Sequence, residues 1–305
     1  MAESPETEIA NAEERRKVGK SRWKLLAVLV AGMLLGAVLT YALVRVPSPV
    51  GSGQAGEGPR LREFFISSGV TTWQIASGVT IDAWAYNATV PGPTIRVTEG
   101  DTVRVTFTNN HVLPHSIHFH GIRDDAMDGM EPVNQSQTRV YEFIARPAGT
   151  WLYHCHVAPV SDHMRMGLYG AFIIDPLAKR ATAHEEVLVL SEWSTTGDME
   201  PEFHVFNGVV NRYVDAPLQV NLGELVRFHL LNLGFEFHTF HLHANVYTVY
   251  PSGTGGGAYV TDTYTLGPGE TAMIEFTYEY PGTYPFHCHV VPHAEMGMLG
   301  LLQVT

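Results

Sequence analysis

The sequence predicts an all-β protein made of two similar β-sandwich domains that follow a single membrane-spanning helix. Three observations lead to this prediction: short runs of β-branched and aromatic residues after residue 60, turn signals between these runs, and a pattern that occurs twice. Residues 94–97 and 102–107 are such runs, and the turns include 91–93 and 267–269, which read Pro-Gly-Pro and Gly-Pro-Gly. Evenly spaced short strands with such turns are typical of β-sandwiches. No long stretch after residue 60 has a convincing helical period.

The first 60 residues form three segments of different composition. Residues 1–24 are polar and end in a group of Lys and Arg, whereas residues 25–44 carry no charge. A helix needs about 20 apolar residues to cross a bilayer, so residues 25–44 are long enough to do so. We therefore expect an uncleaved anchor, with residues 1–24 in the cytoplasm and the domains that follow residue 60 on the periplasmic or extracellular side. Residues 45–60 are rich in Pro, Gly and Ser and are predicted to be a flexible linker.

Two other interpretations of this N-terminal region are weaker. A cleaved signal peptide has a shorter apolar core and a cleavage site of small residues, but residues 43–46 are bulky. Arg15 and Arg16 could belong to a twin-arginine export signal, although the rest of that motif matches poorly.

The repeat sets the domain boundary. Residues 149–156 echo residues 282–289, since both begin with Gly-Thr and end with His-Cys-His, and a Met-Gly-containing stretch follows each of them. We predict a first domain over residues 61–178 and a second over residues 179–305. The two cysteines lie inside the repeated motif and are placed as metal ligands, so no internal disulfide is expected.

The second copy of the motif has the composition of a blue-copper centre. Such a centre takes one Cys and two His in a trigonal plane with a weak axial Met. Cys288, His293 and Met298 supply three of these ligands from one short loop. Successive side chains on a strand point to opposite faces, so His287 and His289 should face away from Cys288. This segment is therefore predicted to hold one copper on each side, joined through covalent bonds.

The same alternation of side chains between the two faces of a strand applies to the other His-rich stretches. Within residues 238–243, His241 and His243 share one face and His238 lies on the other. Residues 115–120 and 154–163 repeat both patterns earlier in the chain. Twelve of the sixteen histidines and both cysteines lie in these stretches. Surface histidines without a metal-binding role are therefore a poor explanation of the pattern.

The four motifs, His-x-x-His-x-His and His-Cys-His in each half, resemble those of the two-domain multicopper oxidases, also called two-domain or small laccases, over roughly residues 61–305. The resemblance implies tandem Greek-key cupredoxin domains, a homotrimer, and a three-copper cluster between the first domain of one subunit and the second domain of the next. The implied type 1 copper sites are His115, Cys155 and His163 with Leu168 at the axial position, and His238, Cys288, His293 and Met298. The implied type 2 ligands are His118 and His241, and the implied type 3 ligands are His120, His154, His156, His243, His287 and His289.

The resemblance also implies an activity: one-electron oxidation of a reducing substrate coupled to the four-electron reduction of O₂ to water. Asp128 matches a family carboxylate near type 2 copper that manages protons, but a turn aspartate before Gly129 is an equally good interpretation. The acidic residue that follows His-Cys-His in many oxidases is replaced by Val in both copies. Leu168 cannot ligate, so the first type 1 site should be three-coordinate and have the higher potential.

Two alternative functions remain open. A copper nitrite reductase carries an acidic residue where His118 stands and lacks a complete His-Cys-His motif in its second domain. A non-enzymatic copper or electron carrier would need only one type 1 site and leaves eight histidines unexplained.

The substrate is the least determined part of the prediction. Phenols, aromatic amines, a redox protein and Cu(I) are all candidates, the last because soft thioethers bind Cu(I) and Met127, Met130, Met164 and Met166 lie near the first-domain motifs. From residue 25 onward there are 13 Lys and Arg against 26 Asp and Glu, which favours neutral or cationic donors over anions, and no nucleic-acid partner is expected. Surface or structural roles are expected for the histidines outside the motifs, His111, His184, His204 and His229.

Overall fold

The computed structural model describes residues 58–198 and 200–305. The predicted tail, the predicted anchor and nearly all of the predicted linker lie outside these residues. In the described part of the chain, no helix combines the length and the apolar character that crossing a bilayer requires.

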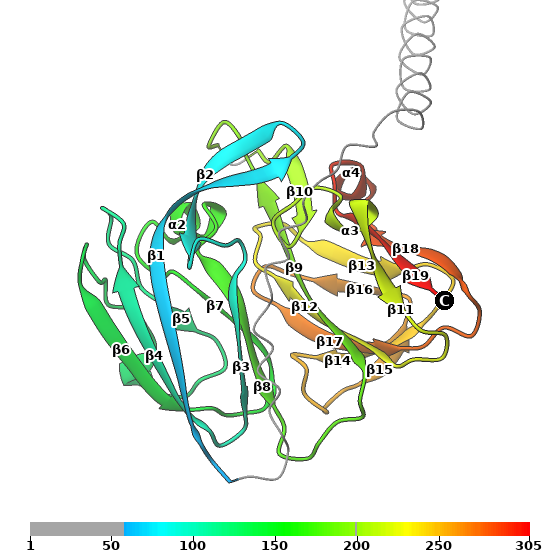
Figure 1. Cartoon of the computed structure of the whole chain (residues 1–305), viewed down its shortest axis with the longest axis horizontal. Coiled ribbons are helices and arrows are strands. Elements are labelled where there is room, and N and C mark those ends of the chain that lie inside the picture. The colour runs from blue at the N-terminus through cyan, green and yellow to red at the C-terminus, as the bar shows by residue number, and fades with distance from the viewer. Residues whose placement is uncertain (1–57, 199) are drawn as a thin grey trace, which may run out of the picture. The chain divides into compact units, whose positions relative to one another are not determined.

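Four β-sheets make up the described part, which confirms the all-β prediction and is consistent with tandem cupredoxin domains (Figure 1). Two sheets come from the chain before residue 176. The first has the order β2-β1-β4-β6 and contains β1 (Leu61–Ala76), β2 (Val79–Tyr86), β4 (Thr102–Asn109) and β6 (Thr138–Ile144). The second has the order β3-β8-β7-β5 and contains β3 (Gly92–Thr98), β5 (His118–Phe119), β7 (Gly149–His154) and β8 (Tyr169–Asp175).

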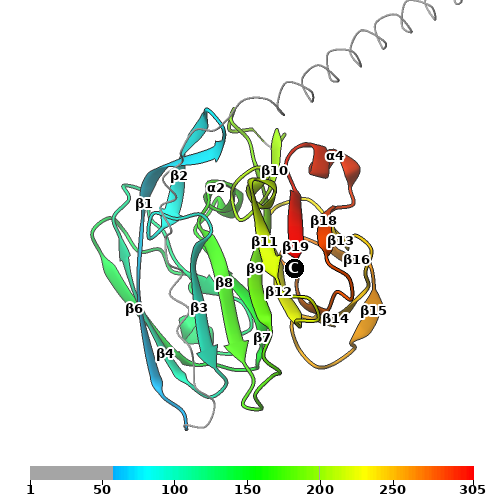
Figure 2. The same cartoon turned by 45° about the vertical axis from the view of Figure 1, so that its right-hand side comes forward.

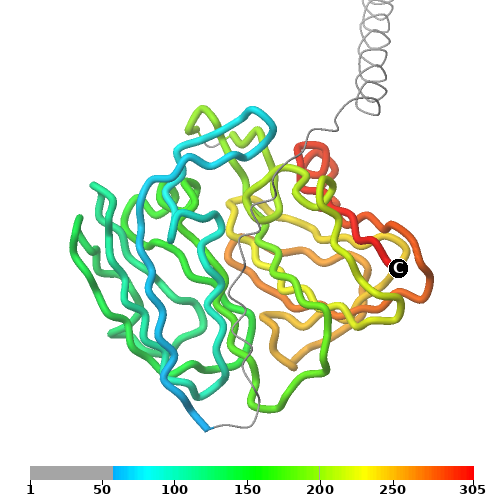
Figure 3. The backbone as a smooth tube through the Cα atoms, viewed as in Figure 1, coloured from blue at the N-terminus to red at the C-terminus, as the bar shows by residue number. Residues whose placement is uncertain are grey.

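The other two sheets come from the chain after residue 183. One has the order β10-β9-β12-β17-β14-β15 and contains β9 (His184–Trp193), β10 (Phe203–Phe206), β12 (Val226–Asn232), β14 (Tyr247–Pro251), β15 (Tyr259–Thr261) and β17 (Thr271–Phe276). The other has the order β11-β19-β18-β13-β16 and contains β11 (Ala216–Val220), β13 (His238–Leu242), β16 (Thr263–Leu266), β18 (Gly282–Cys288) and β19 (Leu299–Val304). Each sheet thus takes its strands from one side of the 176–183 connection, and Figure 3 shows the chain passing from one half to the other.

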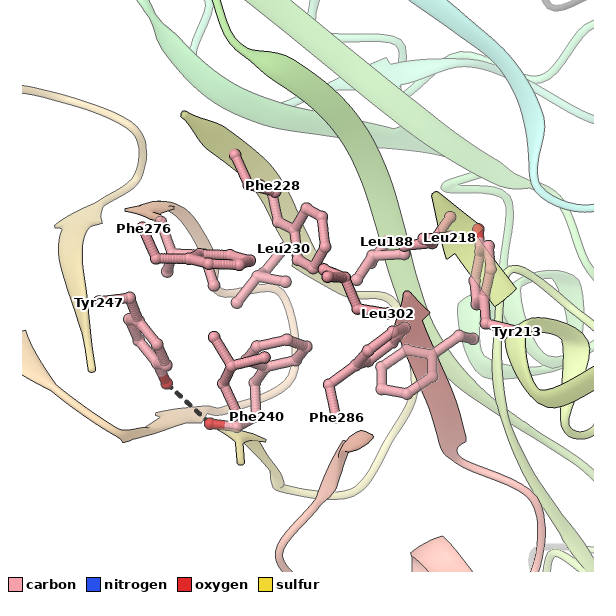
Figure 4. Close-up of a cluster of buried hydrophobic side chains, with 14 of the residues drawn as sticks. Leu188, Tyr213, Leu218, Phe228, Leu230, Phe240, Tyr247, Phe276, Phe286 and Leu302 are labelled. Atoms are coloured by element: carbon pink, nitrogen blue, oxygen red, sulfur yellow. Dashed lines mark hydrogen bonds between the residues drawn. The ribbon is translucent and has the colours of Figure 1, made fainter. Parts of the chain in front are cut away.

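Alternation along the strands explains where the cores lie. In β4 every second residue is buried, because Val103, Val105 and Phe107 point inward from a sheet whose outer face is polar. The second half has an aromatic-rich core between its two sheets, in which Phe228, Phe240 and Phe286 pack on one another (Figure 4). Each core also contains one cysteine, so the thiols are buried among packed apolar side chains.

The two halves share an interface. The β1–β2 hairpin reaches β10 (Figures 1 and 2), where the Trp73 indole N–H donates to the Gly208 carbonyl at 2.9 Å and the Val210 N–H donates to the Ile75 carbonyl at 2.8 Å. Charged side chains also cross it in an interdomain ion network, which comprises Arg96, Asp175, Glu185, Arg227 and Glu275.

Among the described residues, four helices of one or two turns interrupt the sheets: η1 (Asp125–Met127), α2 (Val160–Arg165), α3 (Arg212–Asp215) and α4 (Val291–Glu295). Such helices are too short to produce a helical period in the sequence. Helices α2 and α4 matter for function, because each carries one predicted copper ligand, His163 and His293. The short copper-binding loop expected after Cys288 therefore contains a helical turn.

Candidate metal centres

The second half brings together His238 from β13, Cys288 at the end of β18 and His293 from α4. The Nδ1 atoms of the two histidines lie 3.2 Å apart, and the Cys288 Sγ lies 3.8 Å and 3.6 Å from them. Three ligands at about 2.0–2.3 Å from one ion in a plane would be separated by roughly 3.5 Å, so this donor set fits a bound copper. Met298 is fully buried in the same core as Cys288.

Carboxylates orient both histidines of this centre. Glu192 Oε1 accepts a hydrogen bond from His238 Nε2 at 2.7 Å, and Glu236 Oε2 lies 2.9 Å from His293 Nε2. Because each Nε2 is engaged, each Nδ1 is free to face a metal. Burial opposes protonation of His238, but its contacts with Cys288 and Glu192 outweigh burial and raise its pKa to about 9.

The first half forms a matching centre from His115, Cys155 at the end of β7, and His163 on α2. The two Nδ1 atoms lie 3.0 Å apart, and the Cys155 Sγ lies 3.7 Å from that of His115 and 3.1 Å from that of His163. Leu168 is fully buried and occupies the place that Met298 has in the second half. In both copies the cysteine N–H donates to the carbonyl of the predicted axial residue, Leu168 at 3.0 Å and Met298 at 3.1 Å.

The surroundings of the two centres differ in charge. His115 Nε2 lies 2.7 Å from His111 Nδ1 rather than beside a carboxylate, and the Trp84 ring packs against His163 with centroids 5.2 Å apart. Burial raises the pKa of the Cys155 thiol. It also opposes ionisation of Cys288, but hydrogen bonds from His238 and the Thr239 N–H lower the pKa of that thiol. The first centre is thus neutral in its surroundings and the second is anionic.

Each predicted axial residue follows a glycine with positive φ, Gly167 at +114° and Gly297 at +120°. A Cβ at Gly167 would lie 3.0 Å from the Trp84 carbonyl oxygen, and one at Gly297 would lie 3.0 Å from the His204 carbonyl oxygen. Both turns require glycine, since other residues would be strained and crowded. The backbone N–H of Trp84 donates to the Met166 carbonyl, and the backbone N–H of His204 donates to the Met296 carbonyl. Trp84 and His204 therefore occupy equivalent positions in the two halves.

The remaining histidines of the first half form an imidazole cluster. Strand pairing places His118 opposite His154, and the Nε2 atoms of His120 and His154 lie 3.1 Å apart. Burial is the main cause that lowers the pKa of His120 to about 4 and that of His154 to about 3, which favours the neutral rings that a metal needs. The ring of His156 lies 5.0 Å from that of His118.

The second half has an equivalent imidazole cluster. Pairing of β13 with β18 places His241 opposite His287, and the Nε2 atoms of His243 and His287 lie 3.0 Å apart. The His289 ring lies 5.1 Å from the His241 ring. His243 and His289 are exposed, so this cluster opens onto the surface. Among the described residues, each close group of potential metal-binding side chains takes its members from one half of the chain only.

Asp128 contacts the first imidazole cluster mainly through its backbone. Its carbonyl oxygen accepts a hydrogen bond from His118 Nδ1 at 2.6 Å, whereas its carboxylate Oδ1 lies 3.3 Å from the same nitrogen and the side chain is 40% exposed. The Asp262 carbonyl serves His241 in the same way at 2.9 Å. In both clusters the backbone bond therefore leaves Nε2 free to bind a metal.

The four methionines considered as Cu(I) ligands separate in the structure. Met127 packs against the core of the first half, and Met164 packs against the core between the two halves. Met130 is 52% exposed, while Met166 lines a pocket between the halves. This separation favours packing roles for Met127 and Met164.

Sequence reasoning missed several residues that contact the ligands. His204 is buried and stacks on His293 with ring centroids 3.9 Å apart, and its Nε2 lies 3.0 Å from the carboxylate of Glu236. Glu192 and His111 were also missed as partners of ligands. Glu236 lies two residues before a ligand, which was a possible signal, but Glu192 and His204 reach the site only through the packing of distant strands.

Comparisons with known proteins agree with this geometry. Two family models described as multicopper oxidase match residues 68–179 and 190–305. The copper-containing nitrite reductase of Neisseria meningitidis serogroup A is 32% identical over 260 residues, which cover 76% of this chain and 67% of that protein. A solved multicopper oxidase matches with a TM-score of 0.78 at 38% identity, covering 80% of this chain and 89% of that chain. Copper nitrite reductase from Nitrosomonas europaea matches with a TM-score of 0.77 at 30% identity, covering 80% and 94%.

Proposed function

The chain belongs to the multicopper oxidase family, whose cofactor is copper, and we propose that it couples one-electron oxidation of a small reducing substrate to the four-electron reduction of O₂ to water. The observation that carries this proposal is the pair of imidazole clusters that remain after both Cys-His₂ centres are assembled. In each half three histidines bring their ring nitrogens within 4.8 Å of one another, and the ring of a fourth, His156 or His289, packs against them. A carrier of single electrons has no use for them. Bound copper would supply the one-electron redox chemistry and the site of O₂ binding.

The chain's own residues provide the connection between these centres. Cys155 is bonded through the backbone to His154 and His156, and Cys288 to His287 and His289. In each half the cysteine belongs to the core centre. The histidine before it belongs to the close imidazole group, and the ring of the histidine after it packs against that group. Hydrogen bonds from His154 Nδ1 to the Cys155 carbonyl and from His287 Nδ1 to the Cys288 carbonyl, both 2.8 Å, fix the orientation of these rings.

We further propose that the oxygen-reducing site forms between chains. Each half supplies four imidazoles, too few for three coppers, and the cluster of the second half opens onto the surface. Docking of the first domain of one subunit on the second domain of the next, in a homotrimer, would unite eight imidazoles. In this arrangement His118 and His241 are the type 2 ligands and the other six are the type 3 ligands. Asp128 would hold His118 and manage protons beside it.

Nitrite reduction is the second candidate function, because nitrite reductases are among the relatives. Two local features favour O₂ instead. His118 stands where those enzymes carry an acid, and the second domain has a complete imidazole cluster. We also propose that residues 25–44 anchor the enzyme, with its domains on the outer side of the membrane.

The test is copper content together with acceptor use. The oxidase proposal predicts about five coppers per chain, three for the cluster and one for each Cys-His₂ centre, and O₂ uptake with a phenol or an aromatic amine as the donor. Truncation before residue 61 should give a trimer by light scattering. Nitrite-dependent nitric oxide production without O₂ uptake would refute the oxidase proposal. Full O₂ reduction by a monomer would refute the proposal that the oxygen-reducing site forms between chains.

A further inference from the structure

A hydrogen bond between two hydroxyl groups joins the two halves of the chain. Tyr169 begins β8 in the first half, and its phenol donates to the hydroxyl oxygen of Ser191 on β9 of the second half at 2.9 Å. The two strands lie next to each other (Figure 2), and both side chains are almost completely buried. Apolar side chains surround the bond, because Tyr169 belongs to the core between the halves together with Leu152 and Trp193.

The tyrosine is connected to the first Cys-His₂ centre. It directly follows Leu168, the predicted axial residue. The Cys155 N–H donates to the Leu168 carbonyl at 3.0 Å, so one hydrogen bond and a short run of covalent bonds lead from the cysteine to the Tyr169 phenol. Burial raises the pKa of this phenol, which therefore stays protonated at neutral pH and keeps its bond to the serine.

The serine is connected to the second Cys-His₂ centre. Ser191 directly precedes Glu192, whose carboxylate accepts the hydrogen bond from His238 Nε2 at 2.7 Å. The Nδ1 atom of the same ring faces Cys288 and His293. A line of covalent bonds, interrupted only by three hydrogen bonds, therefore runs through the protein interior from one centre to the other.

Packing alone does not explain the two hydroxyl groups. The second copy of the motif has Leu299 in the place of Tyr169, so the repeated fold does not require a tyrosine there. Buried hydroxyls cost free energy unless they are hydrogen-bonded, and replacing both partners by apolar groups of similar shape can be nearly neutral. A connection between the centres does explain the pair, because electronic coupling decays less along covalent and hydrogen bonds than across van der Waals gaps.

The centres differ in the sense that favours transfer from the second to the first. Leu168 and the neutral surroundings of the first centre are expected to raise its potential, whereas the axial thioether of Met298 lowers that of the second. The carboxylates of Glu192 and Glu236 beside the second centre act in the same direction as Met298. An electron that enters at the second centre therefore moves downhill to the first.

We propose that Tyr169, Ser191 and Glu192 carry electrons between the two Cys-His₂ centres of one chain. One electron leaves Cu(I) at the second centre and reduces Cu(II) at the first, while no covalent bond is made or broken and the phenol keeps its proton. The use of this transfer in O₂ reduction rests on the proposed oxidase function. In the proposed trimer each chain gives its first domain to one oxygen-reducing site and its second domain to another, so neighbouring sites could share electrons.

The test follows an electron after it enters the copper-loaded full chain. A flavin photoreductant under argon supplies fewer electrons than there are chains, and the two blue components are recorded over time. The Cys288→Ser variant, which keeps only the first component, supplies its reference spectrum. The native protein should show a phase, independent of protein concentration, in which the second centre is reoxidised while the first is reduced. Transfer to the imidazole clusters differs from this exchange, because it restores blue absorption without reducing the other centre.

Two variants break the link without changing a metal ligand. Tyr169→Phe and Ser191→Ala should each slow the exchange severalfold, and the double variant should be no slower than either single variant because both remove the same bond. Tyr247→Phe is the matched control, since its buried hydroxyl donates to the Phe240 carbonyl at 2.8 Å, away from the path (Figure 4).

Potentials and copper content separate a relay from a structural role. Both should stay at their native values in the variants, as should the rate of transfer to the imidazole clusters. Exchange at the native rate in folded Tyr169→Phe and Ser191→Ala would overturn the proposal. A slower exchange that is fully accounted for by a smaller difference between the two potentials would overturn it as well.

The outcome can be told apart from that of the proposed function. O₂ uptake together with an exchange rate that the variants leave unchanged would refute the link and leave the oxidase proposal standing. Exchange that depends on Tyr169 in a protein that takes up no O₂ from any donor would refute the oxidase proposal and leave the link standing. A single blue component in the native chain would refute the link, since it would have no second centre to serve.

Discussion

Replacing Glu192 by Gln should raise the reduction potential of the second Cys-His₂ centre. The Glu192 carboxylate is buried, with 7% of its side chain exposed, and lies 2.7 Å from His238 Nε2. Burial opposes its ionisation, but the hydrogen bonds from His238 and from two backbone N–H groups lower its pKa, so it is charged at neutral pH. A negative charge close to the copper stabilises the oxidised ion and lowers the potential.

The size of the effect follows from distance. The hydrogen bond, the width of the imidazole ring and a metal–nitrogen bond of about 2 Å place the carboxylate roughly 7 Å from the metal. At an effective dielectric constant of about 20, one charge at this distance contributes about 2 kcal/mol. For a one-electron couple this is about 100 mV, so Glu192→Gln should shift the second centre upward by about that amount.

The assay is a redox titration of the blue absorption in the copper-loaded protein, with Glu279→Gln as the control because that carboxylate is exposed. The first centre should not move, since its His115 contacts His111 instead of a carboxylate. A shift below about 20 mV, or a downward shift, would show that Glu192 does not set the potential. A shift of both centres together would show that the variant acts through a general change in structure.

Three further outcomes are expected. Cys288→Ser should remove one of two blue components and leave the one that depends on Cys155; complete loss of colour would show that only the second half holds such a centre. Leu168→Met should lower the higher of the two potentials in a titration, and an unmoved high component would mean that Leu168 is not axial; the swap conserves volume, so it should cost less than about 1.5 kcal/mol of stability. Burial favours protonation of Glu185, but its contacts with His229 and Arg96 outweigh burial and lower its pKa below the usual 4.5, so its contribution to stability is present above that pH and is lost as the pH falls. Urea midpoints should therefore fall between pH 5 and pH 3 by more in the native chain than in Glu185→Gln, and equal falls would contradict this.

The sequence was most informative where local geometry decides the outcome. The alternation of side chains on a strand placed Cys288 with His238 and His293, and placed His287 with His241 and His243, as the structure does. The equal spacing of five residues from His163 to Leu168 and from His293 to Met298 placed these two residues at corresponding positions, and the structure buries both fully. Such inferences need only the covalent chain and the period of a strand.

Partners that meet through tertiary packing were not predictable. Glu192 is 46 residues from His238, and the two meet only because β9 and β13 pack in one sandwich. Trp84 and His204 also contact His163 and His293 only through tertiary packing, and nothing in the sequence around them marks these contacts. Asp128 illustrates another difficulty, because its closest contact with His118 is made by a backbone carbonyl that every residue has. The difference in charge around the two centres could therefore not be predicted from the sequence.

Gly167 and Gly297 determine which part of each metal-binding loop can change length. Their missing side chains let the turn before the axial residue lie directly against the backbone of Trp84 or His204, so an inserted residue there would have no room. The stretch between cysteine and histidine has no such constraint in common, since it spans 155–163 in one copy and 288–293 in the other. Loop grafting between the two halves should therefore exchange only the stretch from the cysteine up to the histidine. The five residues that follow the histidine should be kept unchanged.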